Sequence, residues 1–232
     1  MRTSFWTKLL DIISPRACAI CGERLSANEL VLCGVCHMHL PVTHFEQKPL
    51  DNPMARLFWG RFPVERAAAL FFYESQAPVS RLIYDMKYHN MPEVARNMGI
   101  LTARRFAASG FFDGIDALVP MPITWRRKWK RGYNQSYEIA RGISEVTRLP
   151  IFKDVVKRVR FKQSQTRQHA WERLHNVDDA FRLVRPEKID GLHLLLIDDI
   201  VTTGATATAC ACELAKASGV RISILSLGLT KS

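Results

Sequence analysis

The chain has 232 residues, of which 47% are apolar, so it can form one α/β domain of ordinary size with a small appendage, and wholesale disorder is excluded. Its formal net charge is +11, and the stretch from Thr124 to His175 holds 14 Lys and Arg against 4 Asp and Glu. A basic surface this concentrated suits nucleic acid or a phosphate-rich substrate, with a solvated basic face that has no ligand as the alternative.

The N-terminal segment does not resemble a secretion signal, because its apolar run is short and Asp11 interrupts it. No stretch reaches the roughly 18–20 apolar residues that span a bilayer. We therefore expect a soluble, cytoplasmic protein with no membrane insertion. In that reducing compartment, paired cysteines more often bind metal than form disulfides.

Two C-x-x-C pairs occupy the first part of the chain and supply Cys18, Cys21, Cys33 and Cys36. Two residues between cysteines let a tight knuckle direct both sulfurs to one ion, and two knuckles make a tetrahedral zinc site. A site with four protein ligands has no open position, so the zinc is expected to be structural. Four free thiols are the alternative. Cys210 and Cys212 lie two apart in a predicted helix, and we interpret both as small buried residues.

The rest of the chain predicts a doubly wound, mostly parallel α/β sheet, because strands alternate with helices. Residues 1–45 are the expected zinc ribbon, 46–65 a linker or interdomain pad, and 66–232 the α/β domain. Strands are predicted at 67–74, 116–123, 154–161, 192–199 and 220–229, and helices at 77–89, 91–109, 134–148 and 205–218. Residues 164–181 are polar and aperiodic at their start, which predicts a long loop leading into a short helix.

The stretch "LLLIDDIVTTGATATA" begins as a buried strand and leads through a hydroxyl-rich turn into a helix. The turn offers backbone N–H groups, the hydroxyls of Thr202, Thr203 and Thr206, and Gly204, which lets a ligand approach the backbone. A helix N-terminus adds partial positive charge, so the turn is a candidate phosphate cradle. It lacks the lysine of a nucleoside-triphosphate loop.

Asp198 and Asp199 precede this cradle, although carboxylates repel phosphate. The conflict disappears if they face an uncharged part of the ligand. A ribose carries two vicinal hydroxyls that donate well to carboxylates. A phosphate at one end of a ribose and two acids beneath its diol would satisfy every group.

"LLLIDDIVTTGAT" closely resembles the signature of type I phosphoribosyltransferases, which bind 5-phosphoribosyl-1-pyrophosphate (PRPP). "LVPMPITWRRKWKRGYNQS", "SQTRQHAWERLHNVDDAF" and the paired C-x-x-C motifs extend the resemblance. Together they are similar to the ComF family, also called GntX-like proteins, which are zinc-ribbon phosphoribosyltransferase homologues associated with competence for DNA uptake. The resemblance covers the chain from about Cys18 to its end, except for the stretch near residues 46–65.

This resemblance implies a role for each matching residue. Asp198 and Asp199 would hold the ribose hydroxyls, and Lys87 and Arg173 are candidate catalytic residues beside them. The 5′-phosphate would be bound by Thr202, Thr203, Gly204, Ala205 and Thr206. The pyrophosphate loop would comprise Met121 and Pro122, with charge added by Arg126, Arg127 and Lys128. A flexible loop and a family motif would contribute Gln165, Asn176, Arg131, Asn134 and Gln135.

Plainer interpretations exist for several of these residues. The basic cluster from Arg126 to Arg131 can be solvated, Asn134 and Gln135 can cap the following helix, and Lys87 can complement a helix dipole. Trp125, Trp129, Tyr133 and Trp171 lie among Arg and Lys in a pattern that suits base stacking, but core or lid positions are favoured for them.

The implied chemistry is displacement of pyrophosphate from C1 of ribose by a base nitrogen or ammonia, with Mg²⁺ bound together with PRPP. A hood that recognises the acceptor would have to come from residues 37–80 or be missing. Three functions follow: a PRPP-dependent transferase, a module that binds single-stranded DNA or DNA-uptake proteins, and a zinc-dependent assembly factor.

Overall fold

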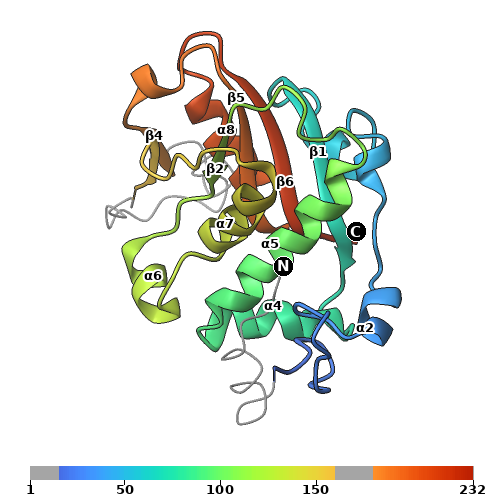
Figure 1. Ribbon diagram of the computed structural model, residues 1–232. Helices are drawn as coiled ribbons and strands as arrows, with labels where there is room; N and C mark the ends of the chain where they lie inside the picture. Colours follow the sequence, from blue (N-terminus) through green and yellow to red (C-terminus); the bar gives the residue numbers. More distant parts are fainter. Residues whose placement is uncertain (1–15, 160–179, 232) are drawn as a thin grey trace, which may run out of the picture.

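A four-stranded parallel sheet forms the centre of the computed structural model, which describes residues 16–159 and 180–231 (Figure 1). Its strands are β1 (Val64–Tyr73), β2 (Ala117–Pro120), β5 (His193–Val201) and β6 (Arg221–Thr230), in the order β1-β6-β5-β2. Every neighbouring pair runs parallel. The inner strands β5 and β6 are buried on both faces, which explains their nearly continuous apolar sequences.

Helices cover both faces of the sheet. On one face, α5 (Pro92–Ala107) packs against α7 (Gln135–Thr147), and Figure 1 shows the two side by side in front of the strands. Gly99 and Gly142 permit this close approach, because a Cβ at either would collide with the backbone of the opposite helix. On the other face, α8 (Ala205–Leu214) packs beside the segment that contains Arg61, whose carbonyl oxygen lies 3.9 Å from the Cys212 sulfur. The predicted doubly wound α/β fold is confirmed.

Two more helices and a short two-stranded ribbon lie beside the sheet. α4 (Val79–Tyr88) precedes α5, and α6 (Trp125–Arg131) follows the turn after β2. Beyond α7, β3 (Val156–Arg158) pairs antiparallel with β4 (Phe181–Leu183), which η3 (Pro186–Lys188) follows. The connection between β3 and β4 lies outside the described residues. It contains the predicted flexible loop with Gln165, Arg173 and Asn176, as well as Trp171.

The N-terminal segment lies against the sheet edge and the helices rather than apart from them. Its regular elements are α2 (Gly34–Met38) and η1 (Phe45–Gln47). Val42 bridges Phe71 on the edge strand β1, and the backbone N–H of Thr43 donates to Leu70. These contacts cover one edge of the sheet, which would otherwise present unpaired backbone groups.

The proline-rich segment 46–65 is ordered by a capped helix. In α3 (Pro53–Arg56), the Asn52 side chain accepts hydrogen bonds from the N–H groups of Met54 and Ala55. Met54, Ala55 and Phe58 are fully buried. The segment therefore packs into the core that the sheet and helices share. The division of the chain at residues 45 and 65 stays a prediction.

Most of the predicted elements are present, with ends that shift by a few residues. The sequence pattern missed α6, because its seven residues are all basic or aromatic and show no apolar periodicity. Within the described ranges, no helix combines the length and hydropathy needed to cross a membrane.

Candidate functional site

The site lies at the carboxyl ends of β2 and β5. Because the two strands are parallel neighbours, with Pro120 beside Ile197, their following segments begin at the same sheet edge. The backbone N–H of Met121 donates to Ile197 at 2.8 Å and fixes the turn after β2 against the acidic pair. Crevices at the carboxyl ends of parallel strands are the usual ligand sites of such sheets.

A cavity of about 160 Å³ opens there, which we call the acidic-pair pocket. It gathers residues that are far apart in the sequence but were predicted to act together. The predicted site residues that line it are Lys87, Met121, Arg127, Arg131, Gln135, Asp198, Asp199, Thr202, Gly204, Ala205 and Thr206.

Other predicted site residues lie elsewhere. Pro122, Lys128 and Asn134 line a neighbouring cavity on the other side of the turn after β2. Arg126 and Thr203 line neither of these two cavities. Gln165, Arg173 and Asn176 fall outside the described residues.

The threonine-rich turn depends on Gly204. This residue is the N-cap of α8 and has φ +75°, a conformation that favours glycine. A Cβ built at Gly204 would lie 3.0 Å from the Phe58 ring. On the outer side, the Arg61 guanidinium donates to the Thr203 carbonyl at 3.0 Å. The segment 46–65 thus supports the turn from outside, while the N-terminus of α8 faces the pocket and suits a phosphate.

The two aspartates have different partners. The Lys87 ammonium lies 3.2 Å from an Asp199 carboxylate oxygen, and both side chains are mostly buried. Asp198 accepts from the Ser136 hydroxyl at 3.2 Å and from the backbone N–H of Asp199 at 2.8 Å. Burial, followed by repulsion from Asp199, raises the pKa of Asp198 to about 7. The pair therefore combines an ion-paired carboxylate with one that holds a proton near neutral pH.

The family motif "RGYNQ", residues 131–135, forms the frame of the pocket. Tyr133 and Gln135 both donate to the Met86 carbonyl, at 2.6 and 3.1 Å, and thereby hold the end of α4 that carries Lys87. Asn134 donates to the Met121 carbonyl at 3.0 Å, and its oxygen caps α7. The motif thus ties α4, α7 and the turn after β2 to one another.

The remaining members of the motif join α6 to this frame. Gly132 ends α6 at φ 79°, and the Arg131 guanidinium donates to the Gln135 side chain at 2.9 Å. The capping interpretation is correct for Asn134 but not for Gln135, whose side chain is buried in the frame.

Sequence reasoning missed Ser136 and Arg158 as residues of the pocket. Ser136 follows the motif directly and supports Asp198, so its position beside the helix cap was the available signal. Arg158 ends β3, where burial and the nearby Arg127 cation lower the pKa of its guanidinium. Its approach to Asp198 depends on how the β3–β4 ribbon folds back, and no sequence pattern encodes that.

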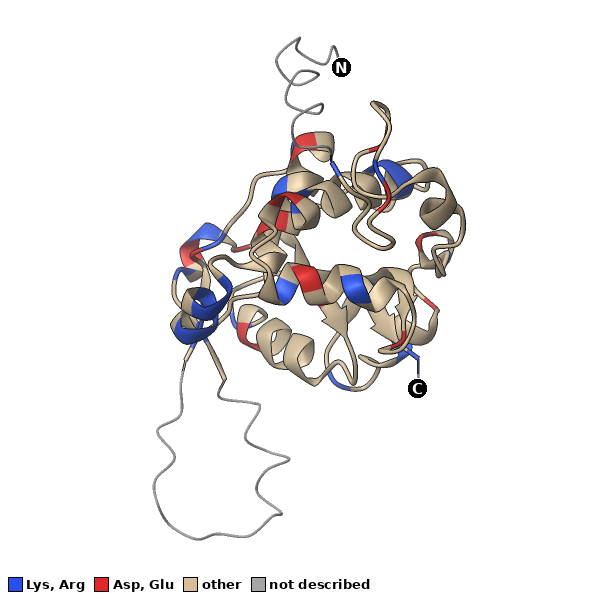
Figure 2. Cartoon of the chain, turned by 90° about the horizontal axis from the view of Figure 1, so that it is seen from below, with Lys and Arg blue, Asp and Glu red and all other residues tan. Residues whose placement is uncertain are grey.

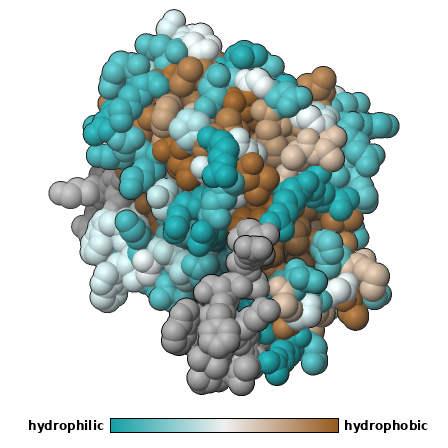
Figure 3. Space-filling view, viewed as in Figure 1, coloured by the Kyte–Doolittle hydropathy of each residue, from teal (hydrophilic) through white to brown (hydrophobic). Residues whose placement is uncertain are grey.

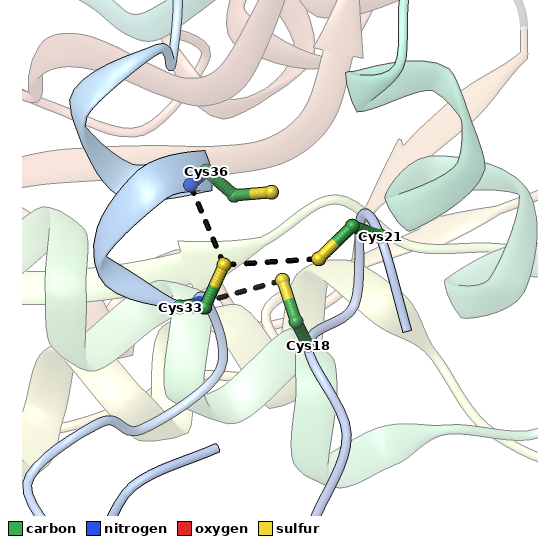
Figure 4. Close-up of side chains that lie close together, drawn as sticks. All are labelled: Cys18, Cys21, Cys33 and Cys36. Atoms are coloured by element: carbon green, nitrogen blue, oxygen red, sulfur yellow. Dashed lines mark hydrogen bonds between the residues drawn. The ribbon is translucent and has the colours of Figure 1, made fainter. Parts of the chain in front are cut away.

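The four N-terminal cysteines converge on one point, with their sulfurs directed toward one another (Figure 4). All four sulfurs lie within 4.8 Å of one another, and those of Cys21 and Cys33 are 3.7 Å apart. Tetrahedral zinc with bonds of about 2.3 Å places sulfurs about 3.8 Å apart, so the donor set fits this metal. The cluster could therefore hold a metal such as zinc.

Hydrogen bonding prepares this cluster for a cation. Burial by itself would raise the pKa of Cys18, but backbone N–H groups, those of Cys21 and Cys33 among them, bring it to about 6. Burial and the neighbouring thiols raise the pKa of Cys36. Without a cation, the thiols of Cys18 and Cys36 thus do not ionise together, and a bound metal would remove that conflict.

Three side chains differ from expectation. Trp125 and Trp129 are 66% and 83% exposed, so neither is a core residue, whereas Tyr133 is buried. The two tryptophans are exposed because α6 projects from the edge of the sheet. Cys212 is also exposed, whereas Cys210 is buried, because neighbours two apart on α8 face different directions.

No protein-family model matches the chain. It is 29% identical over 197 residues to the DNA utilization protein YhgH of Escherichia coli K12, a match that spans 82% of this chain and 79% of the relative. It is 30% identical to competence protein F of Haemophilus influenzae over 56% of this chain and 58% of that protein. It is 29% identical to competence protein ComFC of Bacillus subtilis, over 44% and 41% of the two chains.

Two solved structures are also similar. Adenine phosphoribosyltransferase from Leishmania tarentolae has a TM-score of 0.38 and 12% identity over 78% of this chain and 88% of that one. Glutamine PRPP amidotransferase from B. subtilis has the same TM-score of 0.38 and 19% identity over 56% of this chain and 25% of the other.

Proposed function

The chain is a member of the ComF-like family, and from that premise we propose that it binds PRPP in the acidic-pair pocket and transfers the phosphoribosyl group to a nucleophile. One observation carries the proposal: Asp198 and Asp199 lie in the same pocket as the helix-capping turn around Gly204. A ligand with a sugar diol beside a phosphate suits this combination. A phosphate without a sugar has no hydroxyl groups that could donate hydrogen bonds to the two carboxylates, and it would be repelled by them.

Each part of the pocket has a task in this reaction. The turn and the N-terminus of α8 bind the 5′-phosphate, while the two carboxylates accept from the ribose hydroxyls. The bond from C1 to the pyrophosphate oxygen breaks, pyrophosphate leaves with the bonding electrons, and the acceptor nitrogen forms the new bond to C1 and then loses its proton. Arg127, Arg131 and Arg158 line the same pocket and would stabilise the departing charge.

Two metals belong to this proposal. Mg²⁺, when bound with PRPP, would offset negative charge on the pyrophosphate, and Asp198 and Asp199 supply the oxygen donors that such a hard cation prefers. Zinc would be held by the four cysteines and would stabilise residues 16–45. A cytoplasmic location, where thiols stay reduced and free to bind metal, is also part of the proposal.

Calorimetry with PRPP and Mg²⁺ tests the binding step. We expect the variant Asp198→Asn/Asp199→Asn to weaken binding by about 100-fold or more, since each lost charged acceptor is worth about 1.5–3 kcal/mol. Glu187→Gln is the matched control, because it removes an exposed carboxylate outside the pocket. If PRPP gives no heat and no thermal stabilisation, the proposal is wrong. A screen for pyrophosphate release with bases and ammonia then tests transfer.

A second candidate function is binding of single-stranded DNA, and the exposed α6 favours it. This helix carries Trp125 and Trp129 among five basic residues, and in Figure 2 it stands out as the most continuous basic helix. The α6 corner at the lower left of Figure 3 is coloured pale to teal, the colours of neutral and hydrophilic residues. Exposed aromatic rings beside cations form stacking platforms for bases.

Binding of fluorescent oligothymidylate tests this second candidate. Trp129→Ala should weaken binding by about 1–3 kcal/mol, the usual contribution of one stacked base. Trp59→Ala is the matched control, because Trp59 is also exposed, at 54%, and lies 5.7 Å from the Arg56 guanidinium. Equal effects of the two variants, or binding without a steep salt dependence, would count against a DNA site on α6.

A further inference from the structure

A second cavity lies behind the turn that follows β2. Its volume is about 490 Å³, within the roughly 300–1,000 Å³ of small-molecule sites. Pro120 and Pro122 line it on one side of the turn, whereas Met121 lines the acidic-pair pocket on the other. Ile123 and Arg158 border both spaces. We call this space the basic cavity.

The basic cavity carries an excess of positive charge. Among the described residues, four cations line it: Lys128 from α6, Lys153, and Lys157 and Arg158 from β3. The one carboxylate among its described lining residues, Glu138, already bonds the Arg141 guanidinium at 2.8 Å. Within the described ranges, no carboxylate lies within ion-pair distance of any of the four cations. Cations gathered around a concave space without a counter-charge favour an anionic ligand.

The same cavity also has an apolar wall. Pro122, Val156 and the half-buried Tyr137 contribute to it. The Lys153 ammonium lies 5.6 Å from the centre of the Tyr137 ring, so the cation and the aromatic surface adjoin. A ligand with both a phosphate and a planar ring would contact both parts, whereas a simple anion would leave the apolar wall uncovered.

We propose that the basic cavity binds a nucleotide, with its phosphate at Lys153 and Lys157 and its base against Pro122 and Tyr137. The nucleotide can be free, or it can be one unit of a single strand. The site does not require the acidic-pair pocket to bind PRPP. Because Arg158 borders both spaces, its loss should weaken anion binding in each, whereas loss of Lys153 and Lys157 should affect the basic cavity alone.

Calorimetry with thymidine monophosphate tests the site. We expect Lys153→Gln/Lys157→Gln to weaken binding about tenfold or more, which corresponds to about 1.4 kcal/mol. Both lysines are exposed, so the variant should fold. Lys48→Gln, which removes one exposed cation outside the cavity, should leave binding unchanged. Thymidine without phosphate, and inorganic phosphate alone, should both bind more weakly than the nucleotide.

A comparison of an oligonucleotide with a monophosphate shows whether the ligand is a strand or a free nucleotide. If 5′-phosphorylated oligothymidylate competes and binds more tightly than the monophosphate, the ligand is a strand. If it binds no more tightly, the ligand is a free nucleotide. The proposal is overturned if the double lysine variant binds the monophosphate normally, if inorganic phosphate binds equally well, or if Asp198→Asn abolishes nucleotide binding. PRPP binding is measured separately on the same variants, so failure of one site is distinguishable from failure of the other.

Discussion

The four-cysteine cluster and the acidic-pair pocket are assembled in opposite ways. The cysteines lie within 19 consecutive positions, from Cys18 to Cys36, and their spacing alone brings four sulfurs together. The pocket takes Lys87 from α4, Arg131 and Gln135 from the α6–α7 region, and its acids from β5. Local spacing is therefore sufficient for a metal site of this kind, whereas the ligand pocket exists only when distant elements pack correctly.

Among the substitutions, removal of one cysteine ligand should lower the stability of the protein the most. Cys33→Ser removes one of four ligands, and because binding of structural zinc is coupled to folding, we expect loss of the metal and a destabilisation of several kcal/mol. The damage should concentrate in residues 16–45, with the pocket less affected. Metal analysis together with hydrogen exchange would measure both effects. Cys212→Ser is the control, because this exposed cysteine lies on α8, outside the cluster. Equal metal loss in both variants would contradict the assignment.

Asp198→Asn should have the next largest effect on the free energy of unfolding, and it should raise this energy. The folded protein raises the pKa of Asp198 to about 7, so it binds a proton that the unfolded chain has released above pH 4. This acid therefore costs stability as pH rises from about 4 to 7, by up to about 4 kcal/mol. The Asp198→Asn variant should therefore be more stable than the unchanged ligand-free protein at pH 8. At pH 4 the two should differ little in stability. Denaturant unfolding across this pH range measures the difference, and a loss of stability at pH 8 would contradict it.

Gly204→Ala should cost about 1–3 kcal/mol, because it combines a left-handed backbone conformation with a close contact to Phe58. Gly114→Ala is a matched control, since Gly114 has φ +72° but no atom within 4 Å of an added Cβ. The excess loss of stability at Gly204 reports the packing of the segment 46–65 against the turn. Equal losses in chemical denaturation would show that this contact contributes nothing.

The smallest change in the free energy of unfolding is expected from Tyr133→Phe. The substitution removes one hydrogen bond to the Met86 carbonyl, worth about 1 kcal/mol, while Gln135 keeps the other. Combining it with Gln135→Leu should cost more than the sum of the two single changes, since only then is the buried carbonyl left without a donor. A double-mutant cycle of unfolding free energies measures this coupling. Strict additivity would mean that the motif does not act as one frame.

The sequence predicted the sheet and its helices well, because buried parallel strands such as β5 and β6 have continuous apolar sequences. It could not predict α6, whose basic sequence lacks that pattern, or the exposure of Trp125 and Trp129. The acidic pair and the threonine turn were found from their residue types alone. Ser136 and Arg158 were not, since their approach to Asp198 depends on the packing of α7 and on the β3–β4 ribbon.

The sequence by itself determined the four-cysteine cluster, the buried strands and the strand end that carries Asp198 and Asp199, because each depends on residues close together in the chain. Only the tertiary structure decided that Lys87 pairs with Asp199, that "RGYNQ" holds the end of α4, and that Arg158 borders two cavities. These contacts join elements dozens of residues apart, and packing around the sheet brings them together.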